Sequence, residues 1–259
     1  MTQPANRDQT SALSRTQDHL KQLVYGGNDG IVTTFAIVAG FAGAGAEGVA
    51  QIGALAVLVF GLANLFADAV SMGLGEFLSM RSQNDLYKQR HAEQIRRIAG
   101  DPAGEATLLA HLLQQRGLSA TQASDTVQLL AAHPPLMADL TLSWGFGMQA
   151  PEDANPALNG LMTFLSFVVF GAVPLSPYFV LEPTDTTFLL SVAITLLALM
   201  ALGLLRWIAT RDRLLRAVAE TVAVGAVCAL VAYGVGWLGG GLTRAPCQPT
   251  IPPACPKPS

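Results

Sequence analysis

The sequence predicts an all-α, polytopic membrane protein with five transmembrane helices and a cytosolic helical insert between the second and the third. Three observations lead to this fold class. Of the 259 residues, 51% are hydrophobic and only 13% are charged, a balance typical of membrane proteins. The apolar residues form five runs, and one long polar stretch separates the second run from the third. Almost all basic residues lie on one side of these runs.

The first two transmembrane helices are predicted within residues 25–80, after a cytosolic N-terminal tail over residues 1–24. The glycine-rich segment 26–30 signals a turn and a helix start, and an uncharged run over residues 31–46 follows it. This run is short, because a helix needs roughly 17 to 25 residues to cross the hydrocarbon core. Asp29 therefore either lies inside a span that begins earlier or caps the helix at the membrane interface.

A polar turn at residues 46–48 separates the first run from the second, which extends from Ile52 to Met80. Beyond it, residues 81–155 are rich in charged and polar side chains, and we expect them to form the cytosolic insert. Glycine and proline signals divide this insert into about three short helices. The signals lie at residues 100–102, 116–117, 133–135 and 151–153.

Three further apolar runs lie within residues 156–242, and each is long enough to cross a membrane. They cover residues 158–181, 187–207 and 217–242. The first of them contains Pro174 and Pro177, which a membrane helix tolerates where its neighbours satisfy the freed carbonyl groups. The last ends in a glycine-rich segment suited to close contact between helices.

The distribution of basic residues predicts the orientation. Of the 15 lysines and arginines, 13 lie in the N-terminal tail, in the insert or between the fourth and fifth runs, which places these parts in the cytosol. The Pro-rich residues 243–259 then form a disordered tail outside, where Cys247 and Cys255 either pair in an oxidising compartment or remain free thiols. Without an apolar signal peptide, and with many alanines, glycines and leucines, the chain is expected in a bacterial cytoplasmic membrane.

Ionisable side chains within the second apolar run are the strongest functional signal. Four residues recur at every fourth position and so share one face of a helix: Asn64, Asp68, Met72 and Glu76. In a membrane such a face must meet a partner helix, a cavity or an ion path. The alternative interpretation is that the two polar residues at its start only bind helix to helix, and that the methionine faces lipid.

The residue types on this face favour metal ions. A thioether beside carboxylates suits borderline divalent metals such as iron(II), manganese(II) or cobalt(II). Carboxylates in a low-dielectric path also exchange protons as a cation passes, because desolvation raises their pKa and a cation lowers it. Proton-coupled metal transport follows from these two properties. A formal net charge of -3 gives no reason to expect a nucleic-acid partner.

Three segments of the chain form long, specific motifs: DGIVTTFAIVAG at residues 29–40, SMGLGEFLS followed by RSQNDLY within residues 71–87, and GAVPLSPY at residues 171–178. Together they resemble the vacuolar iron transporter family, in a bacterial-type form. The resemblance covers about residues 24 to 240. It implies a homodimer that carries iron(II), and often manganese(II), out of the cytosol in exchange for protons, along a path between the two subunits.

The resemblance also assigns positions in the spans. The first-span aspartate of the family falls on Asp29 and its second-span methionine on Met72. The second-span acidic residue of plant-type members falls on Asn64, so we expect Asp68, one turn later, to supply that charge. Glu220 matches a glutamate at the start of the fifth span, where it either acts at the cytosolic end of the path or pairs with a nearby arginine, Arg213 or Arg216.

The insert departs further from the family. In plant-type members it is a helical metal-binding domain, and the resemblance places its five glutamates at Gln94, Arg97, Glu105, Leu108 and Gly145. Only Glu105 is kept, so we expect the insert to retain its helical shape and dimer contacts with weak or no metal clustering. Other donors lie nearby in the sequence, and the two histidines among them are typical surface residues: Glu93, His91, His111, Met137 and Asp139.

The sequence therefore predicts a non-enzymatic, homodimeric transporter in the lipid bilayer that exports iron(II) or manganese(II) against protons. The expected metal ligands are Asp29, Asp68 and Met72 in the spans, with assistance from Asn64 and Glu76, and Glu105 in the insert. No resident cofactor is expected, because the metal is the cargo. Two rival hypotheses stay open: a transport-inactive scaffold or sensor with the same fold, and a transporter of a different cation.

Overall fold

The computed structural model describes residues 7–44, 50–151, 155–181, 184–210 and 213–243. Within these ranges the protein contains helices and no strand, as the sequence predicts. The predicted turn at residues 46–48 and the two cysteines of the C-terminal tail, Cys247 and Cys255, lie outside the described residues.

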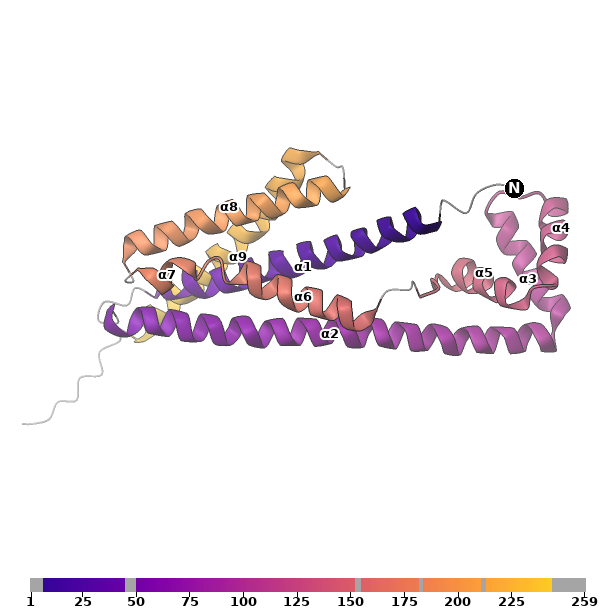
Figure 1. Ribbon diagram of the computed structural model, residues 1–259, viewed down its shortest axis with the longest axis horizontal. Helices are drawn as coiled ribbons and strands as arrows, with labels where there is room; N and C mark the ends of the chain where they lie inside the picture. The colour runs from indigo at the N-terminus through magenta and orange to yellow at the C-terminus, as the bar shows by residue number, and fades with distance from the viewer. Residues whose placement is uncertain (1–6, 45–49, 152–154, 182–183, 211–212, 244–259) are drawn as a thin grey trace, which may run out of the picture. The chain divides into compact units, whose positions relative to one another are not determined.

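The chain forms two compact units. The first comprises residues Met1–Met72 and Met162–Ser259, and the second comprises Gly73–Leu161. The helices of the first unit are α1 (Arg7–Gly43), the start of α2 (Ala50–Gly100), most of α6 (Pro156–Gly171), α7 (Ser176–Val180), α8 (Asp185–Thr210) and α9 (Leu214–Thr243). The second unit holds the remainder of α2 and the helices α3 (Pro102–Gln115), α4 (Ala120–Ala131) and α5 (Pro134–Phe146), as Figure 1 shows.

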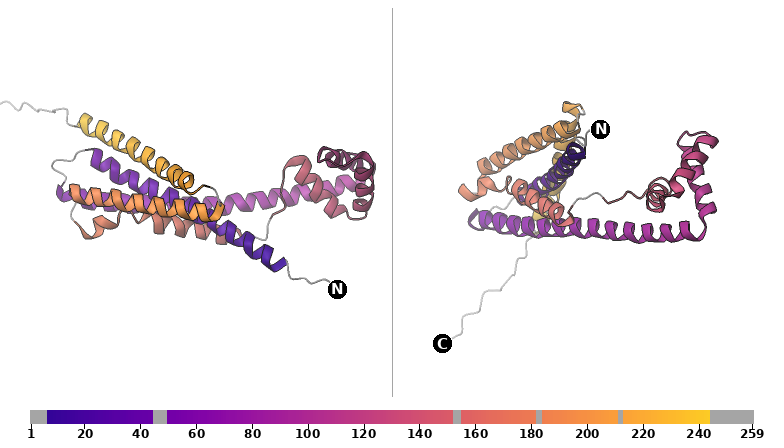
Figure 2. Two further views of the ribbon diagram at one scale, coloured as in Figure 1. Left: turned by 90° about the horizontal axis from the view of Figure 1, so that it is seen from above. Right: turned by 45° about the vertical axis from the view of Figure 1, so that its right-hand side comes forward.

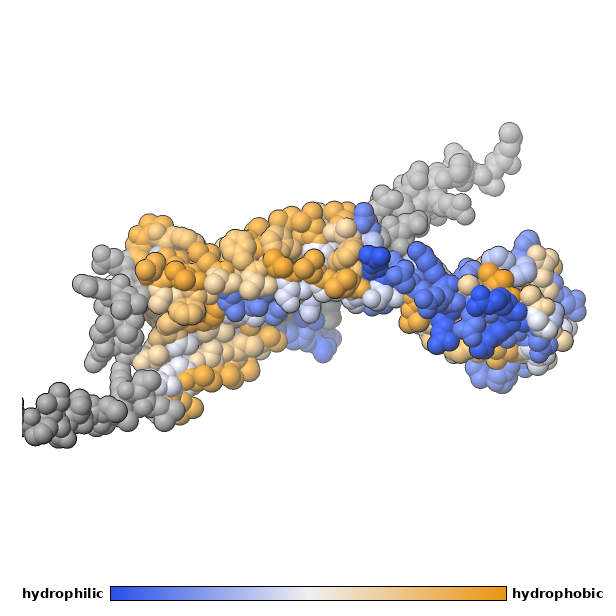
Figure 3. Space-filling view, turned by 90° about the horizontal axis from the view of Figure 1, so that it is seen from below, coloured by the Kyte–Doolittle hydropathy of each residue, from blue (hydrophilic) through white to orange (hydrophobic). Residues whose placement is uncertain are grey.

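Three helices in the described part of the chain are long and apolar enough to cross a membrane: α2, α8 and α9. α6 is apolar but shorter, and α1 does not meet the same criterion. Apolar side chains cover most of the outer surface of the first unit on the face drawn in Figure 3. A water-soluble protein rarely exposes so large an apolar area, so these helices indicate an integral membrane protein.

The expected turn at the glycines of residues 26–30 is absent, because α1 runs through them without interruption. These glycines serve close packing instead. A Cβ atom on Gly26 would lie 2.9 Å from the carbonyl oxygen of Thr163, and one on Gly30 only 2.5 Å from that of Phe167. α1 and α6 therefore approach backbone to backbone. Asp29 lies inside the helix, so the interpretation as an N-terminal cap was wrong.

The third predicted span is also interrupted. α6 ends at Gly171, and the short helix α7 begins only at Ser176. Pro174 lies in this break, where its ring blocks the helical path and its nitrogen cannot donate. The Ser191 hydroxyl of α8 donates to the Pro174 carbonyl oxygen at 2.7 Å and satisfies one freed acceptor. A neighbouring helix thus supports the break.

α1, α8 and α9 run side by side in the first unit (Figures 1 and 2). α1 and α9 meet through small residues near their C-terminal ends. A Cβ atom on Gly236 would lie 2.0 Å from the Gly40 carbonyl oxygen, and one on Gly43 would lie 2.2 Å from the Tyr233 carbonyl oxygen. The glycine-rich end of α9 therefore packs closely against α1, as the sequence predicts, although Gly234 has no neighbour within 4 Å.

Gly236→Ala is expected to destabilise the protein by about 1–3 kcal/mol, because the added methyl group forces α1 and α9 apart. The matched control is Gly234→Ala, whose methyl group enters open space two residues earlier on the same helix. Titration of the detergent-solubilised protein with a denaturing detergent would measure both free energies of unfolding. Equal stability of the two variants would contradict the close approach of these helices.

The second unit contains the three short helices that the turn signals predict. Asp101 caps α3 by accepting from the Gly104 amide at 2.9 Å, and Ser119 and Gln122 form a capping box at the start of α4. The helices enclose an apolar core made of Ile98, Leu109, Leu113, Ala123, Val127, Met137 and Ala138. This core shows that the insert has its own packing, independent of lipid.

Candidate functional site

The polar face of α2 begins with a hydrogen bond between neighbouring turns. The Asn64 side-chain amide donates to the Asp68 carboxylate at 2.6 Å, and both side chains are partly buried. This bond is local to α2, since its partners lie four residues apart. It orients the Asp68 carboxylate while leaving other carboxylate lone pairs available for a cation.

Asp29 brings a second carboxylate to this region from α1. It is partly buried, and the charge of Asp68 acts on it through space. Two carboxylates that interact in a low-dielectric region repel each other unless a proton or a cation lies between them. Their proximity therefore creates a position that favours a positive charge.

Met72 lies two turns after Asn64 and packs against a buried cluster of the first unit. This cluster consists of Leu65, Ala69 and Phe167, and Met72 is partly buried beside it. Part of its side chain therefore packs against protein. Glu76, the last residue of the same face, is partly buried one turn further along α2 and belongs to the second unit.

A cavity of about 480 Å³ opens beside Asn64. α1 and α2 of the first unit line it, and its walls are otherwise apolar: Ile37, Gly40, Phe41, Ala44 and Phe60. The Phe41 and Phe60 rings are tilted against each other with centroids 6.1 Å apart. Asn64 is the polar side chain among the residues that line this cavity.

The donor set of the first unit suits a divalent cation better than an organic substrate. Asp29 and Asp68 supply anionic oxygen, Asn64 supplies an amide oxygen, and Met72 supplies a thioether that favours borderline metals over magnesium. The structure thus places the four expected residues of the first unit on two neighbouring helices. Within the described residues it contains no group of three or more His, Cys, Asp or Glu side chains that could hold a metal.

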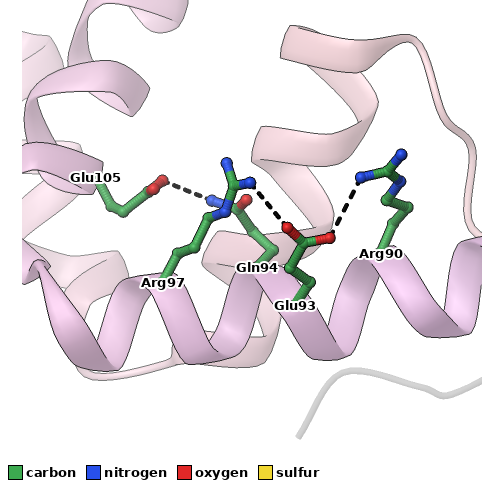
Figure 4. Close-up of polar contacts among 5 residues, drawn as sticks. All are labelled: Arg90, Glu93, Gln94, Arg97 and Glu105. Atoms are coloured by element: carbon green, nitrogen blue, oxygen red, sulfur yellow. Dashed lines mark hydrogen bonds and ion pairs between the residues drawn. The ribbon is translucent and has the colours of Figure 1, made fainter.

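Two carboxylates of the insert are already engaged by neighbouring side chains (Figure 4). The Gln94 amide donates to the Glu105 carboxylate at 2.5 Å, which joins α2 to α3. Arg97 and Arg90 both bind Glu93, at 2.8 Å and 3.2 Å, and hold the pKa of that carboxyl below its usual value. Glu105, the expected metal ligand of the insert, is therefore already engaged by a neutral donor.

Gln94→Glu is expected to make the contact between α2 and α3 depend on a divalent cation. The change would set two carboxylates against each other, and a cation would relieve their repulsion. Manganese(II) should then increase amide-hydrogen protection in α3 more in this variant than in the native protein. Gln94→Leu, which removes the hydrogen bond without adding charge, is the control. An equal response of all three proteins would contradict the prediction.

A second polar cluster of the insert was not anticipated from the sequence. His91 on α2 lies 3.0 Å from the Asp139 carboxylate of α5, and the Tyr87 hydroxyl donates to the same carboxylate oxygen at 2.5 Å. His91 was interpreted as an ordinary surface histidine. The sequence separation of His91 and Asp139 does not predict their contact, because only the packing of α5 on α2 brings the two residues together. Met137, another expected donor, is instead buried in the apolar core.

Glu220 near the start of α9 is held by two arginines. It accepts from Arg216 at 2.9 Å, as one interpretation of the sequence predicts, and from Arg206 of α8 at 2.9 Å. The Arg206 contact was not predicted. These ion pairs tie α8 to α9 and account for the glutamate without a role in binding cargo.

Comparison of the sequence with known proteins identifies similar proteins. The sequence model of the VIT family matches residues 20–237. The protein named vacuolar iron transporter 1 of Oryza sativa subsp. japonica is 30% identical over 216 residues, which are 83% of either chain. The one of Arabidopsis thaliana is 29% identical over 214 residues, again 83% of either chain. The vacuolar iron transporter of Plasmodium falciparum is 30% identical over 229 residues, which are 85% of this chain and 82% of that protein.

Proposed function

The chain belongs to the VIT family, and from this premise we propose that it exports divalent metal ions, iron(II) or manganese(II), from the cytosol in exchange for protons. The matched segment includes α2 and the part of α1 that carries Asp29, so it contains the candidate ligands of both helices. The names of the relatives support metal transport, and the choice of ion is argued from the side chains of this chain.

The observation that carries the proposal is the group of Asp29, Asp68 and Asn64 within apolar helices. Burying two interacting carboxylates in a membrane protein is costly, so their presence points to a cation that uses them. Met72 favours iron(II), manganese(II) or cobalt(II) over magnesium.

Proton exchange follows from the same group. With no metal bound, a proton relieves the repulsion between Asp29 and Asp68, and an entering divalent cation displaces it. Each transport cycle would then move protons in the direction opposite to the metal. No resident cofactor is required by this scheme, because the cation is the cargo.

We further propose that two copies of the chain assemble around this face, with the N-terminus and the insert in the cytosol. Asn64 and Asp68 are only partly buried in one copy. A polar face left open to lipid would be unfavourable, and a second copy would cover it. The excess of basic residues in the N-terminal tail, the insert and the α8–α9 loop supports the orientation. A bacterial cytoplasmic membrane is the proposed location.

Uptake of iron(II), manganese(II) and cobalt(II) into proteoliposomes with an imposed pH gradient tests the proposal. We expect metal uptake to depend on the pH gradient. We also expect the pH inside the proteoliposomes to change as metal enters. Met72→Leu, which conserves volume, should reduce iron(II) and cobalt(II) uptake more than manganese(II) uptake, because the thioether is the softest donor. Absence of uptake for every metal, in protein shown to be folded, would leave a scaffold or sensor as the function.

A further inference from the structure

The contact between α2 and α5 of the insert contains three metal-compatible donor atoms that the proposed transport path does not use. We propose that the His91 imidazole, the Asp139 carboxylate and the Pro135 carbonyl oxygen form a binding site for a borderline divalent metal. Such a site would take cobalt(II), zinc(II), iron(II) or manganese(II), and it would exclude magnesium, which avoids imidazole nitrogen.

The two distances from His91 Nε2 to the other donor atoms are compatible with a shared metal ion. The His91 Nε2 atom lies 3.0 Å from Asp139 Oδ1 and 3.3 Å from the Pro135 carbonyl oxygen. Metal bonds to nitrogen and oxygen are about 2.0–2.2 Å long, so neighbouring donors in octahedral or tetrahedral sites are about 3.0–3.4 Å apart. Pro135 and Asp139 lie four residues apart in α5, so the Pro135 carbonyl also accepts the helical hydrogen bond of the Asp139 amide, and a metal ion would use its second lone pair.

Tyr87 contacts both His91 and Asp139 and can orient them as metal ligands. Its hydroxyl donates to Asp139 Oδ1, and its ring stacks on His91 with centroids 5.9 Å apart. Burial and the hydrogen bond to Asp139 raise the pKa of Tyr87 to about 12, so the hydroxyl remains a donor at neutral pH. Hydrogen bonds of this kind fix the direction of a ligating carboxylate.

The same nitrogen can hold either a proton or a metal. With a proton on Nε2, His91 donates toward the two oxygens, and this is the arrangement expected without metal. When a metal ion binds Nε2, the single proton of the neutral imidazole moves to Nδ1, and the same three donor atoms stay together. The side chains of His91 and Asp139 are 24% and 43% exposed, which leaves the position open to solvent.

This site uses none of the carboxylates drawn in Figure 4, which are already bound by neighbouring side chains. There, Glu93 is held by arginines and Glu105 by Gln94. Its use as a place where cargo is first captured rests on the proposed transport function. Its existence as a binding site does not, and the two are tested separately.

Diethylpyrocarbonate labelling of the full-length protein, read for each histidine by mass spectrometry, tests the site. The reagent attacks neutral imidazole nitrogen, so a bound metal protects it. Saturating cobalt(II) is expected to slow His91 labelling by about tenfold as the sites fill. His111, an exposed histidine on α3 that contacts Gln115 at 3.1 Å, serves as the internal control and should be unaffected.

Two variants separate a metal site from a hydrogen-bonded contact. Tyr87→Phe retains all three ligands and should raise the cobalt(II) concentration needed for half-protection by about tenfold. Asp139→Asn should abolish protection at the same concentrations. Cobalt(II) should protect at lower concentration than manganese(II), and magnesium should not protect.

Equal labelling of His91 with and without cobalt(II), or equal protection of His91 and His111, would overturn the site. Unchanged half-protection in Asp139→Asn would overturn it as well. If His91 is protected but proteoliposomes take up no metal, the site stands and the transport proposal fails. If uptake occurs without protection of His91, the transport proposal stands and the site is absent.

Discussion

Asp68→Asn is expected to reduce metal uptake by about a hundredfold, because a divalent cation at this partly buried position loses one of the two carboxylates that attract it. The change keeps the size of the side chain, and an asparagine oxygen can still accept from Asn64, so the helix should remain intact. What is lost is the second negative charge beside Asp29. A divalent cation would then face one carboxylate instead of two.

Asp85→Asn is the matched control for this variant. Asp85 lies on the same helix, is 59% exposed and reaches Arg81 only at 4.0 Å. The same chemical change should leave uptake unaffected there, because exposed ion pairs contribute little. Initial rates of manganese(II) uptake, normalised to the amount of reconstituted protein, would measure both. Native uptake by folded Asp68→Asn protein would mean that Asn64 and Asp68 serve only the structure of α2.

Leu109→Ala is expected to destabilise the insert by about 2–5 kcal/mol, the usual cost of emptying a fully buried leucine site. Leu109 has no exposed surface and lies in the core between α3, α4 and α5. The three short helices pack on one another through this core. Hydrogen exchange of the full-length protein should show protection lost across all three short helices, by at least about tenfold in rate.

Leu108→Ala provides the comparison at the neighbouring position. Leu108 is 40% exposed, and the family resemblance places a glutamate there. Its truncation should change stability by less than about 0.5 kcal/mol, as surface substitutions usually do. Equal losses in the two variants would mean that α3 is oriented differently from the structure described here.

Helical packing explains where the sequence interpretation failed in the spans. When only neighbouring residues are considered, the glycines at residues 26–30 and the prolines at 174 and 177 all predict turns or helix ends. In the structure the glycines lie within α1 and allow α6 to pack closely against it. Pro174, in contrast, lies in the break between α6 and α7. Local sequence cannot separate these outcomes, because a backbone contact with another helix decides whether a glycine turns or packs.

The polar face of α2 shows what periodicity could and could not predict. Spacing alone placed Asn64, Asp68, Met72 and Glu76 on one face of a helix, and α2 has that helical geometry. Spacing did not predict that Asn64 would donate to Asp68, or that Met72 would pack on Phe167. Such details depend on rotamers and on neighbouring helices.

The sequence by itself determined the all-helical class, the membrane character, the three helices of the insert and the family. These properties follow from composition, helical period, caps and long local motifs, which act over a few residues. Only the tertiary structure decided the break after α6, the pairing of Arg206 with Glu220, and the meeting of Tyr87, His91 and Asp139. Each of these joins segments far apart in the chain, and their contact depends on how whole helices pack.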